Sequence, residues 1–357
     1  MKIELLCVIA LLACLMLIGV EYIIHYRLAE RQDEHSVREQ NMTRRMNIRV
    51  DAVLRAPTRA CLQSEIKAMS EDIGDDHEAY ETAIRVMSEI REKRGDEKID
   101  KLIEEIKDEV NPVEIYAKML EEGDDYHKGY ALRKLADLGA EEYRDTMTEL
   151  LSSKNRDLAY NAAMSLVQFG DVENVADYIM SIEDDRKYSG RIVNEFFDDF
   201  KGDRAKLAEC LFERCNNYMK STIIKAIVPY KIEEFRPMYI EGLAGKDFGM
   251  KVACIKAIAA FGNPEDEQLL QIAAKDKEWV IRASAVRGLS LLNTKSALKS
   301  VKVALTDKEW WVRQTAAKAI TEMDISPRDL EDILGGYDRF AADAVKAVLY
   351  KKVDSLA

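Results

Sequence analysis

The sequence predicts an all-α protein, with one N-terminal transmembrane helix followed by an α-solenoid of stacked helix pairs. Three observations support this fold class. Apolar residues make up 47% of the 357 residues and only 16 Gly and 6 Pro interrupt them, which favours helices over a turn-rich β fold. A long apolar run lies near the N-terminus, and an apolar pattern returns about every 31 residues farther along the chain.

The apolar run covers residues 3–24. No charged residue lies between Leu5 and Val20, and 22 helical residues reach roughly 33 Å, enough to cross a hydrocarbon core of about 30 Å. A cleaved signal peptide is the main alternative, but Leu17–Val20 is bulky where small residues precede a cleavage site. A lipoprotein box at Leu11–Cys14 is the other alternative, although a bulky Leu12 departs from that pattern. We therefore expect an uncleaved single span.

The basic residues beside the span predict its orientation. Several arginines follow the span, whereas only Lys2 and the terminal amine precede it. These arginines are Arg27, Arg31, Arg38, Arg44, Arg45, Arg49, Arg55 and Arg59. Because basic residues stay on the cytoplasmic side, we expect a single-pass protein of the cell membrane with a cytoplasmic C-terminal solenoid. Residues 25–56 then form a charged juxtamembrane spacer, in which Arg44, Arg45 and Arg49 either touch anionic lipid or, as we favour, lie on a solvated helix.

Residues 57–122 carry helical patterns that precede the clear repeats. Asp75–Arg94 and Asp96–Val110 space their apolar residues as helices do, and Val110-Asn111-Pro112 breaks the pattern. We predict a helical cap in this region, with degenerate repeats as the alternative.

The solenoid is predicted over residues 123–357 from an apolar anchor that returns at intervals of 30 or 31 residues. The anchors are Leu138, Phe169, Phe200, Tyr230, Phe261, Leu292 and Met323. The residues three and seven positions before every anchor are also apolar, and these three positions share one face of a helix. A shorter helix follows each anchor. A helix pair of this size buries its apolar face only by stacking on its neighbours.

The last repeats also resemble a known family, the HEAT repeats, in which an Asp and an Arg six residues apart mark the second helix. Asp276–Arg282 and Asp307–Arg313 have that spacing, and their Trp-Val-Ile-Arg and Trp-Trp-Val-Arg segments look most like the short HEAT-like repeats of bilin lyases. The resemblance covers about residues 123–323, with a degenerate last unit near Ser326–Lys352. It implies that the longer second helices line the concave face of the array.

The Asp and Arg residues of this pattern have an expected structural role. Asp276 and Asp307 stand just before the longer helices, where a side-chain oxygen caps free backbone N–H groups. We expect Arg282 and Arg313 to bridge the capping Asp residues of adjacent repeats.

The sequence shows no chemistry of its own. It contains no glycine-rich phosphate loop, nucleophile elbow or HExxH helix. Without a CxxC pair, Cys61, Cys210, Cys215 and Cys254 are predicted to be small buried hydrophobes. The resemblance to bilin lyases implies a chromophore pocket, and the related deoxyhypusine hydroxylases imply a di-iron site on repeated His-Glu pairs, of which only His77-Glu78 is present. We therefore expect no enzyme, no cofactor and no metal site.

The charge distribution favours a protein partner. Lys plus Arg number 53 against 65 Asp plus Glu, and the resulting net charge of -12 disfavours general nucleic-acid binding. Four successive repeats nevertheless place a basic residue five positions before the anchor: Lys225, Lys256, Arg287 and Lys318. Stacking sets these residues, here called the basic row, roughly 10 Å apart. We hypothesise that the basic row binds an acidic segment of a partner; the alternative is a solvated face paired with local acids.

Trp310 and Trp311 open the last of the long repeat helices. They either pack between repeats or form an aromatic binding hot spot, and as neighbours on one helix they cannot both face inward. Together these features predict a membrane-anchored HEAT-repeat scaffold or adaptor for protein partners, such as a membrane enzyme. The alternatives are a bilin-lyase-like HEAT enzyme and a regulatory subunit of a membrane-bound glycosyltransferase complex that builds envelope polysaccharide.

Overall fold

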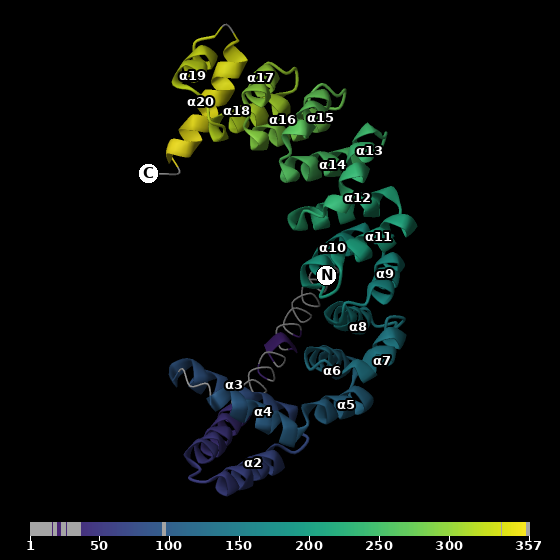
Figure 1. Ribbon diagram of the computed structural model, residues 1–357, viewed down its shortest axis with the longest axis vertical. Coiled ribbons are helices and arrows are strands. Elements are labelled where there is room, and N and C mark those ends of the chain that lie inside the picture. Colours follow the sequence, from purple (N-terminus) through teal and green to yellow (C-terminus); the bar gives the residue numbers. More distant parts are fainter. Residues whose placement is uncertain are drawn as a thin grey trace, which may run out of the picture. The chain divides into compact units, whose positions relative to one another are not determined.

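The computed structural model describes residues 16, 20–22, 26, 37–94, 98–336 and 338–354 (Figure 1). Within these ranges the regular elements are helices and no strand occurs, so the predicted all-α class is confirmed. The chain divides into two compact units, residues 1–138 and residues 139–357.

Most of the predicted transmembrane segment, residues 3–24, lies outside the described residues. The described part of the chain contains no helix that is both long and apolar enough to cross a membrane. The single span therefore stays a prediction from the sequence, as does the orientation inferred from it.

The N-terminal unit is a bundle of helices. They are the helical residues 37–55, α2 (Arg59–Ile73), α3 (His77–Arg94), α4 (Lys98–Val110), α5 (Pro112–Glu122) and α6 (Asp125–Asp137). Met46, Val50 and Val53 are at most 2% exposed, and Arg49 Nε lies 2.5 Å from Asp72 Oδ2 of α2. Residues 37–55, which the sequence placed in the spacer, thus contribute to the core of this unit.

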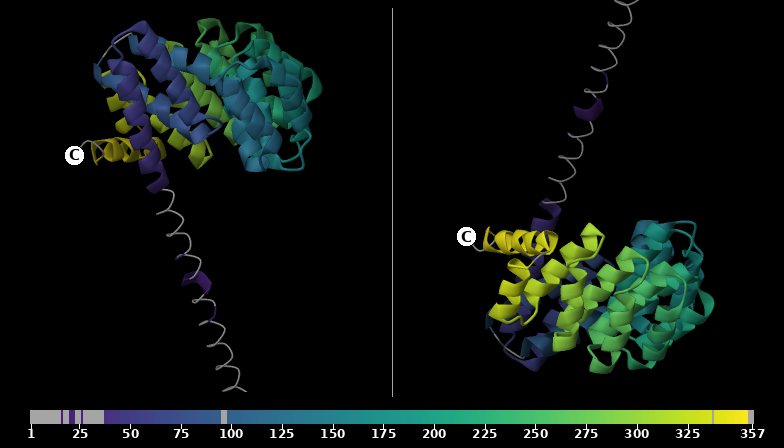
Figure 2. Two further views of the ribbon diagram at one scale, coloured as in Figure 1. Left: turned by 90° about the horizontal axis from the view of Figure 1, so that it is seen from below. Right: turned by 90° about the horizontal axis from the view of Figure 1, so that it is seen from above.

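The C-terminal unit is a stack of helix pairs in two layers (Figure 1 and Figure 2). The pairs are α7 (Arg144–Leu150) with α8 (Arg156–Phe169), α9 (Val172–Ser181) with α10 (Arg186–Asp199), α11 (Arg204–Arg214) with α12 (Asn217–Ile227), α13 (Arg236–Ala244) with α14 (Phe248–Phe261), α15 (Glu267–Ala273) with α16 (Trp279–Leu292), α17 (Lys295–Ala304) with α18 (Trp310–Glu322), and α19 (Pro327–Leu334) with α20 (Arg339–Asp354). Short 3-10 turns at Glu141–Tyr143, Val228–Tyr230, Glu233–Phe235 and Pro264–Asp266 join some of them. From α12 onward, each second helix packs against the second helix of the next pair.

The predicted repeat periodicity is confirmed by burial. The residues three and seven positions before each anchor are at most 1% exposed throughout, from Ala131 and Leu135 to Ala316 and Ile320. The anchors themselves lie at or just beyond the helix ends, and only Phe200 and Met323 among them are buried. Most anchors are less buried than the residues three and seven positions before them, because a residue in the last turn of a helix has neighbours on one side only.

The caps of the longer helices differ slightly from the prediction. Asp276 Oδ1 accepts a hydrogen bond from the Glu278 N–H, and Asp307 Oδ1 accepts one from the Glu309 N–H, both at 2.9 Å. The helices themselves begin one residue after Glu278 and Glu309. The two Asp side chains therefore order the turn before each helix instead of occupying its N-cap position.

The cysteine prediction is correct for two of the four residues outside the apolar run. Cys215 and Cys254 are buried, and burial raises the pKa of the Cys215 thiol to about 11 and that of Cys254 to about 12. Cys210 is half-buried and Cys61 is exposed. The prediction was wrong for Cys61 because its position in the first turn of α2 faces solvent.

Candidate partner-binding surface

The structure brings the basic row together on four adjacent second helices. Lys225 lies on α12, Lys256 on α14, Arg287 on α16 and Lys318 on α18, and all four side chains are exposed. The pKa of Lys225 is lowered, first by partial burial and then by the positive charge of Lys256. The neighbouring cations are thus close enough to repel one another.

Most members of the basic row have no acidic partner nearby. Among the described residues, no ion pair or hydrogen bond to an acid is formed by the side chains of Lys225, Lys256 or Arg287. Lys318 Nζ lies 3.9 Å from Glu322 Oε1, one turn later on the same helix, with both side chains exposed. An exposed pair of this kind contributes only about 0.3–0.5 kcal/mol. Three of the four cations are therefore available to a counter-charge from outside the chain.

A groove of about 680 Å³ adjoins the last two members of the basic row. Its walls come from three successive second helices, α16, α18 and α20. Small side chains such as Ala283 and Ser284 line it from α16, and Trp311 lines it from α18. Arg287, Lys318 and Lys351 also reach it, against Glu322 as the acid in the lining. The groove therefore combines apolar surface with a predominantly cationic edge.

The tryptophans form an exposed aromatic cluster beside this groove. The rings of Trp279 and Trp311 are stacked across consecutive repeats, 6.3 Å apart, and Trp310 meets Trp311 edge-on at 4.6 Å. Trp310 is nonetheless 53% exposed and Trp311 57% exposed. As expected for neighbours on one helix, Trp310 and Trp311 point in different directions. Trp311 lines the groove, and Trp310 lines a smaller pocket between α18 and α20.

Arg282 has the structural role that the sequence predicted. Its side chain is 7% exposed, and Nε and Nη2 each lie 2.7 Å from a carboxylate oxygen of Asp307 in the next repeat. Burial would raise the pKa of Asp307, but hydrogen bonds from Arg282 and from the Glu309 N–H outweigh it and the pKa is lowered. One repeat earlier, Lys251 Nζ lies 3.0 Å from Asp276 Oδ2. These pairs join consecutive repeats.

The same prediction was wrong for Arg313. Its Nη1 donates to the carbonyl oxygens of Asp307 and Lys308, but no described carboxylate pairs with it. The guanidinium carbon instead lies 5.6 Å from the centre of the Phe340 ring. Asp338, the candidate acid of the degenerate last repeat, accepts a hydrogen bond from the Ala341 N–H at 3.0 Å. Sequence spacing alone therefore could not distinguish Arg313 from Arg282.

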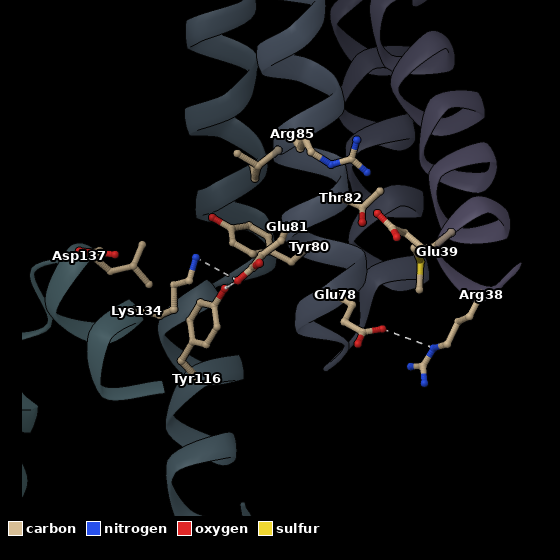
Figure 3. A pocket seen from close by; sticks show the side chains of 13 residues that line it. Arg38, Glu39, Glu78, Tyr80, Glu81, Thr82, Arg85, Tyr116, Lys134 and Asp137 are labelled. Carbon is tan, nitrogen blue, oxygen red and sulfur yellow. Dashed lines mark hydrogen bonds and ion pairs between the residues drawn. The ribbon is translucent and has the colours of Figure 1, made fainter. Parts of the chain in front are cut away.

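A second pocket, of about 570 Å³, lies within the N-terminal unit (Figure 3). Lys134 and the Tyr116 hydroxyl point toward Glu81, at 3.1 Å and 2.7 Å from its Oε1, and the Tyr130 hydroxyl also donates to that oxygen. Burial would raise the pKa of Glu81, but these donors lower it. Burial, with the nearby Glu104, also raises the pKa of Tyr80 to about 12. This cluster could not be predicted from local sequence patterns, because its members come from three different helices.

The Glu81 cluster has a clear structural role. It joins α3, which carries Glu81, to α5 and α6, which carry the donors. Across the pocket, Arg38 Nε lies 3.4 Å from Glu78 Oε2 (Figure 3). The adjacent His77 packs edge-on against Tyr130, with ring centres 5.9 Å apart. The described residues include no group of three His, Cys, Asp or Glu side chains that could hold a metal ion.

Comparisons with known proteins agree with the repeat pattern. The model of the HEAT repeats matches residues 113–192 and 267–350. No curated protein matches the sequence significantly.

Similar solved structures include human deoxyhypusine hydroxylase in complex with glycerol, which is 13% identical, with 72% of this chain and 96% of that chain covered and a TM-score of 0.30. Two engineered proteins are also similar. One is 12% identical, with 87% and 95% of the two chains covered and a TM-score of 0.32, and the other is 14% identical, with 66% and 97% covered and a TM-score of 0.22. Scores of this size carry no inference about function. The matched residues and the stacked helix pairs show that the chain contains HEAT repeats.

Proposed function

We propose that this chain is a membrane-anchored HEAT-repeat scaffold that holds a protein partner at the cytoplasmic face of the cell membrane, without catalysis of its own. The observation that carries the proposal is the basic row, in which Lys225, Lys256 and Arg287 have no counter-charge among the described residues. The partner contributes an acidic segment that lies along the basic row and enters the groove between α16, α18 and α20.

Electrostatics and burial both support an acidic protein segment as the occupant. Like charges in a row repel, and the lowered pKa of Lys225 reflects its partial burial together with repulsion from Lys256. Carboxylates of a partner would relieve it, while Trp311 and the small side chains of α16 offer apolar surface to the same segment. Nucleic acid is a poorer occupant because a net charge of -12 repels a long polyanion.

The proposed anchor gives the scaffold its location. A single span at residues 3–24 keeps the repeats within reach of membrane proteins. Tethering raises the effective concentration of a partner, so that weak contacts along the basic row suffice for capture.

The partner-binding role is tested by charge reversal on the full chain in membranes. A photocrosslinker at Ser284, within the groove, should capture acidic peptides that mass spectrometry identifies. Lys256→Glu, Arg287→Glu and Lys318→Glu together should abolish this capture. The matched control reverses Lys275, Lys295 and Lys299, which are exposed residues outside the basic row, and should leave capture intact. Undiminished crosslinking by the first triple variant would refute the proposed function.

The anchor and its orientation are tested separately. We expect the full chain to stay in the membrane fraction after alkaline extraction, and a variant lacking residues 3–24 to be released. The exposed Cys61 reports on orientation. An impermeant maleimide should label it in inverted vesicles and not in intact cells; labelling in intact cells would contradict the cytoplasmic placement.

A further inference from the structure

Arg313 is held in the same pose as Arg282, one repeat earlier. Nη1 of Arg282 donates to the carbonyl oxygens of Asp276 and Lys277, both at 3.0 Å. Nη1 of Arg313 donates to the equivalent carbonyl oxygens of Asp307 and Lys308, at 2.8 and 3.0 Å. In both helices the guanidinium is thus fixed by the backbone of the preceding turn.

The two arginines differ at the edge that binds a carboxylate. Nε and Nη2 of Arg282 hold both oxygens of Asp307, which lies 25 residues later. Asp338 lies at the same separation from Arg313, but its carboxylate accepts a hydrogen bond from the Ala341 N–H and forms no ion pair with Arg313. Nε and Nη2 of Arg313 have no hydrogen-bond acceptor among the described residues. The repeat therefore builds a carboxylate site at Arg313 and does not fill it.

The surroundings of Arg313 suit a carboxylate from outside the chain. It lines a pocket of about 300 Å³ with Trp310, Phe340 and Lys351. Phe340 is 71% exposed, so the pocket is open to a partner. Asp343 is the acid in the lining, and its Oδ2 already lies 3.6 Å from Arg339 Nε. The pocket therefore has two cations, Arg313 and Lys351, and one acid, Asp343, which also faces Arg339.

The pocket adjoins the groove of the proposed function. Gln314 and Lys351 line both cavities, and the adjacent Trp310 and Trp311 line one each. We propose that Arg313, assisted by Lys351, binds an Asp or Glu side chain of the acidic segment that occupies the groove, in place of the Asp that a regular next repeat would supply. This inference rests on the proposed function and assigns one carboxylate of the partner to a specific site.

Intrinsic fluorescence gives a direct assay of this site. The chain contains 3 Trp, and all of them belong to the cluster beside the groove and the pocket. The probe is a short synthetic peptide with Asp at every third position between Leu and Ser residues, titrated into the detergent-solubilised full chain. We expect a saturable change in tryptophan emission, and no such change with the peptide in which Asn replaces Asp.

Variants of Arg313 test the assigned contact. Arg313→Gln should weaken peptide binding about tenfold, since a charge-assisted, two-bond contact is lost. Arg313→Lys should recover only part of the affinity, because an ammonium keeps the charge without the planar fork. Arg328→Gln, an exposed arginine on α19, is the matched control and should bind as the unchanged chain does. Thermal melting of each variant identifies any loss of binding that results from unfolding.

The outcomes separate this inference from the proposed function. Equal affinity of the Arg313→Gln variant and the unchanged chain, or no response to the Asp peptide at all, would overturn the carboxylate site. A response to phosphatidylglycerol vesicles without a response to the peptide would also overturn it, in favour of lipid. If Arg313→Gln preserves capture in membranes while reversal of the basic row abolishes it, only this inference fails. The opposite result removes the proposed function and leaves the carboxylate site.

Discussion

The position five residues before the anchor has different roles in the two halves of the repeat array. In α8 it is Met164, which is 1% exposed, and in α10 it is Glu195, which accepts a hydrogen bond from the Tyr160 hydroxyl at 2.5 Å. In α12, α14, α16 and α18 it is a member of the basic row. The stack forms equally well with an apolar, a paired or an unpaired side chain at this position. The fold therefore does not require the basic row, and this agrees with the proposed role of these residues in binding.

The largest expected effect on stability comes from exchanging the residue types that the two halves carry at this position. Met164→Lys places an ammonium in the buried site on α8, and we expect it to lower the free energy of unfolding by about 3–4 kcal/mol, or to force the lysine to lose its proton. The reverse change, Lys256→Met, should alter stability by less than about 0.5 kcal/mol because the side chain is exposed. Urea unfolding followed by circular dichroism measures both. Similar losses in the two variants would remove the distinction between the halves.

A second test compares the stability lost when the ion pair of Arg282 is broken with the stability lost when Arg287, on the same helix, loses its charge. Asp307→Asn removes the carboxylate that holds Arg282, leaves a nearly buried guanidinium without its counter-ion and should cost about 3 kcal/mol. Arg287→Gln, five residues after Arg282 on α16, should cost less than about 0.5 kcal/mol while weakening partner capture. The same unfolding measurement applies. A large stability loss for Arg287→Gln would mean that the basic row supports the fold.

In the N-terminal unit, we expect the loss of the Glu81 carboxylate to lower stability by an intermediate, pH-dependent amount. Glu81→Gln should cost about 1–2 kcal/mol at pH 7, because charge-assisted hydrogen bonds from two tyrosines and Lys134 are weakened and Glu81 is one-third exposed. The folded-state pKa of Glu81 is lowered from its ordinary value near 4.5. Its stabilising contribution is therefore full above pH 4.5 and is lost as the pH falls through the lowered value. The difference between variant and unchanged chain should narrow at pH 3; a constant difference would contradict this account.

The smallest expected effect is a shift in the pKa of Lys225, a member of the basic row. Lys256→Gln removes the positive charge that helps to lower the pKa of Lys225. The pKa of Lys225 should rise, and stability at neutral pH should rise by a few tenths of a kcal/mol, since less repulsion opposes the charged lysine in the folded state. NMR titration of labelled lysine side chains measures the shift. An unchanged pKa would show that the two side chains do not interact.

The apolar pattern correctly predicted which positions of the repeat helices face the core. The residues three and seven positions before each anchor were predicted from helical spacing alone, and all are buried. Helical spacing is a property of a single helix, so it can be read without knowing the neighbours. The anchors were predicted less well, because several of them extend past the last turn and stay partly exposed.

The candidate surface was predicted in part. The basic row, Trp310 and Trp311 follow from the repeat and lie on neighbouring helices as expected. The groove, the open site at Arg313 and the contributions of Phe340 and Lys351 did not follow, because α20 belongs to a degenerate repeat whose register the sequence left uncertain. The cluster around Glu81 was also missed, because its tyrosines lie 35 and 49 residues away in the chain.

The amino-acid order determined that helix pairs form and that each pair needs neighbours, because apolar residues at helical spacing leave one face of every pair to be covered. Only the packed structure decided which polar groups found partners. Arg282 meets Asp307, whereas Arg313, placed by the same pattern, meets a phenylalanine ring. Such partnerships depend on how an adjoining helix ends and turns, and that geometry arises from contacts between distant parts of the chain rather than from local spacing.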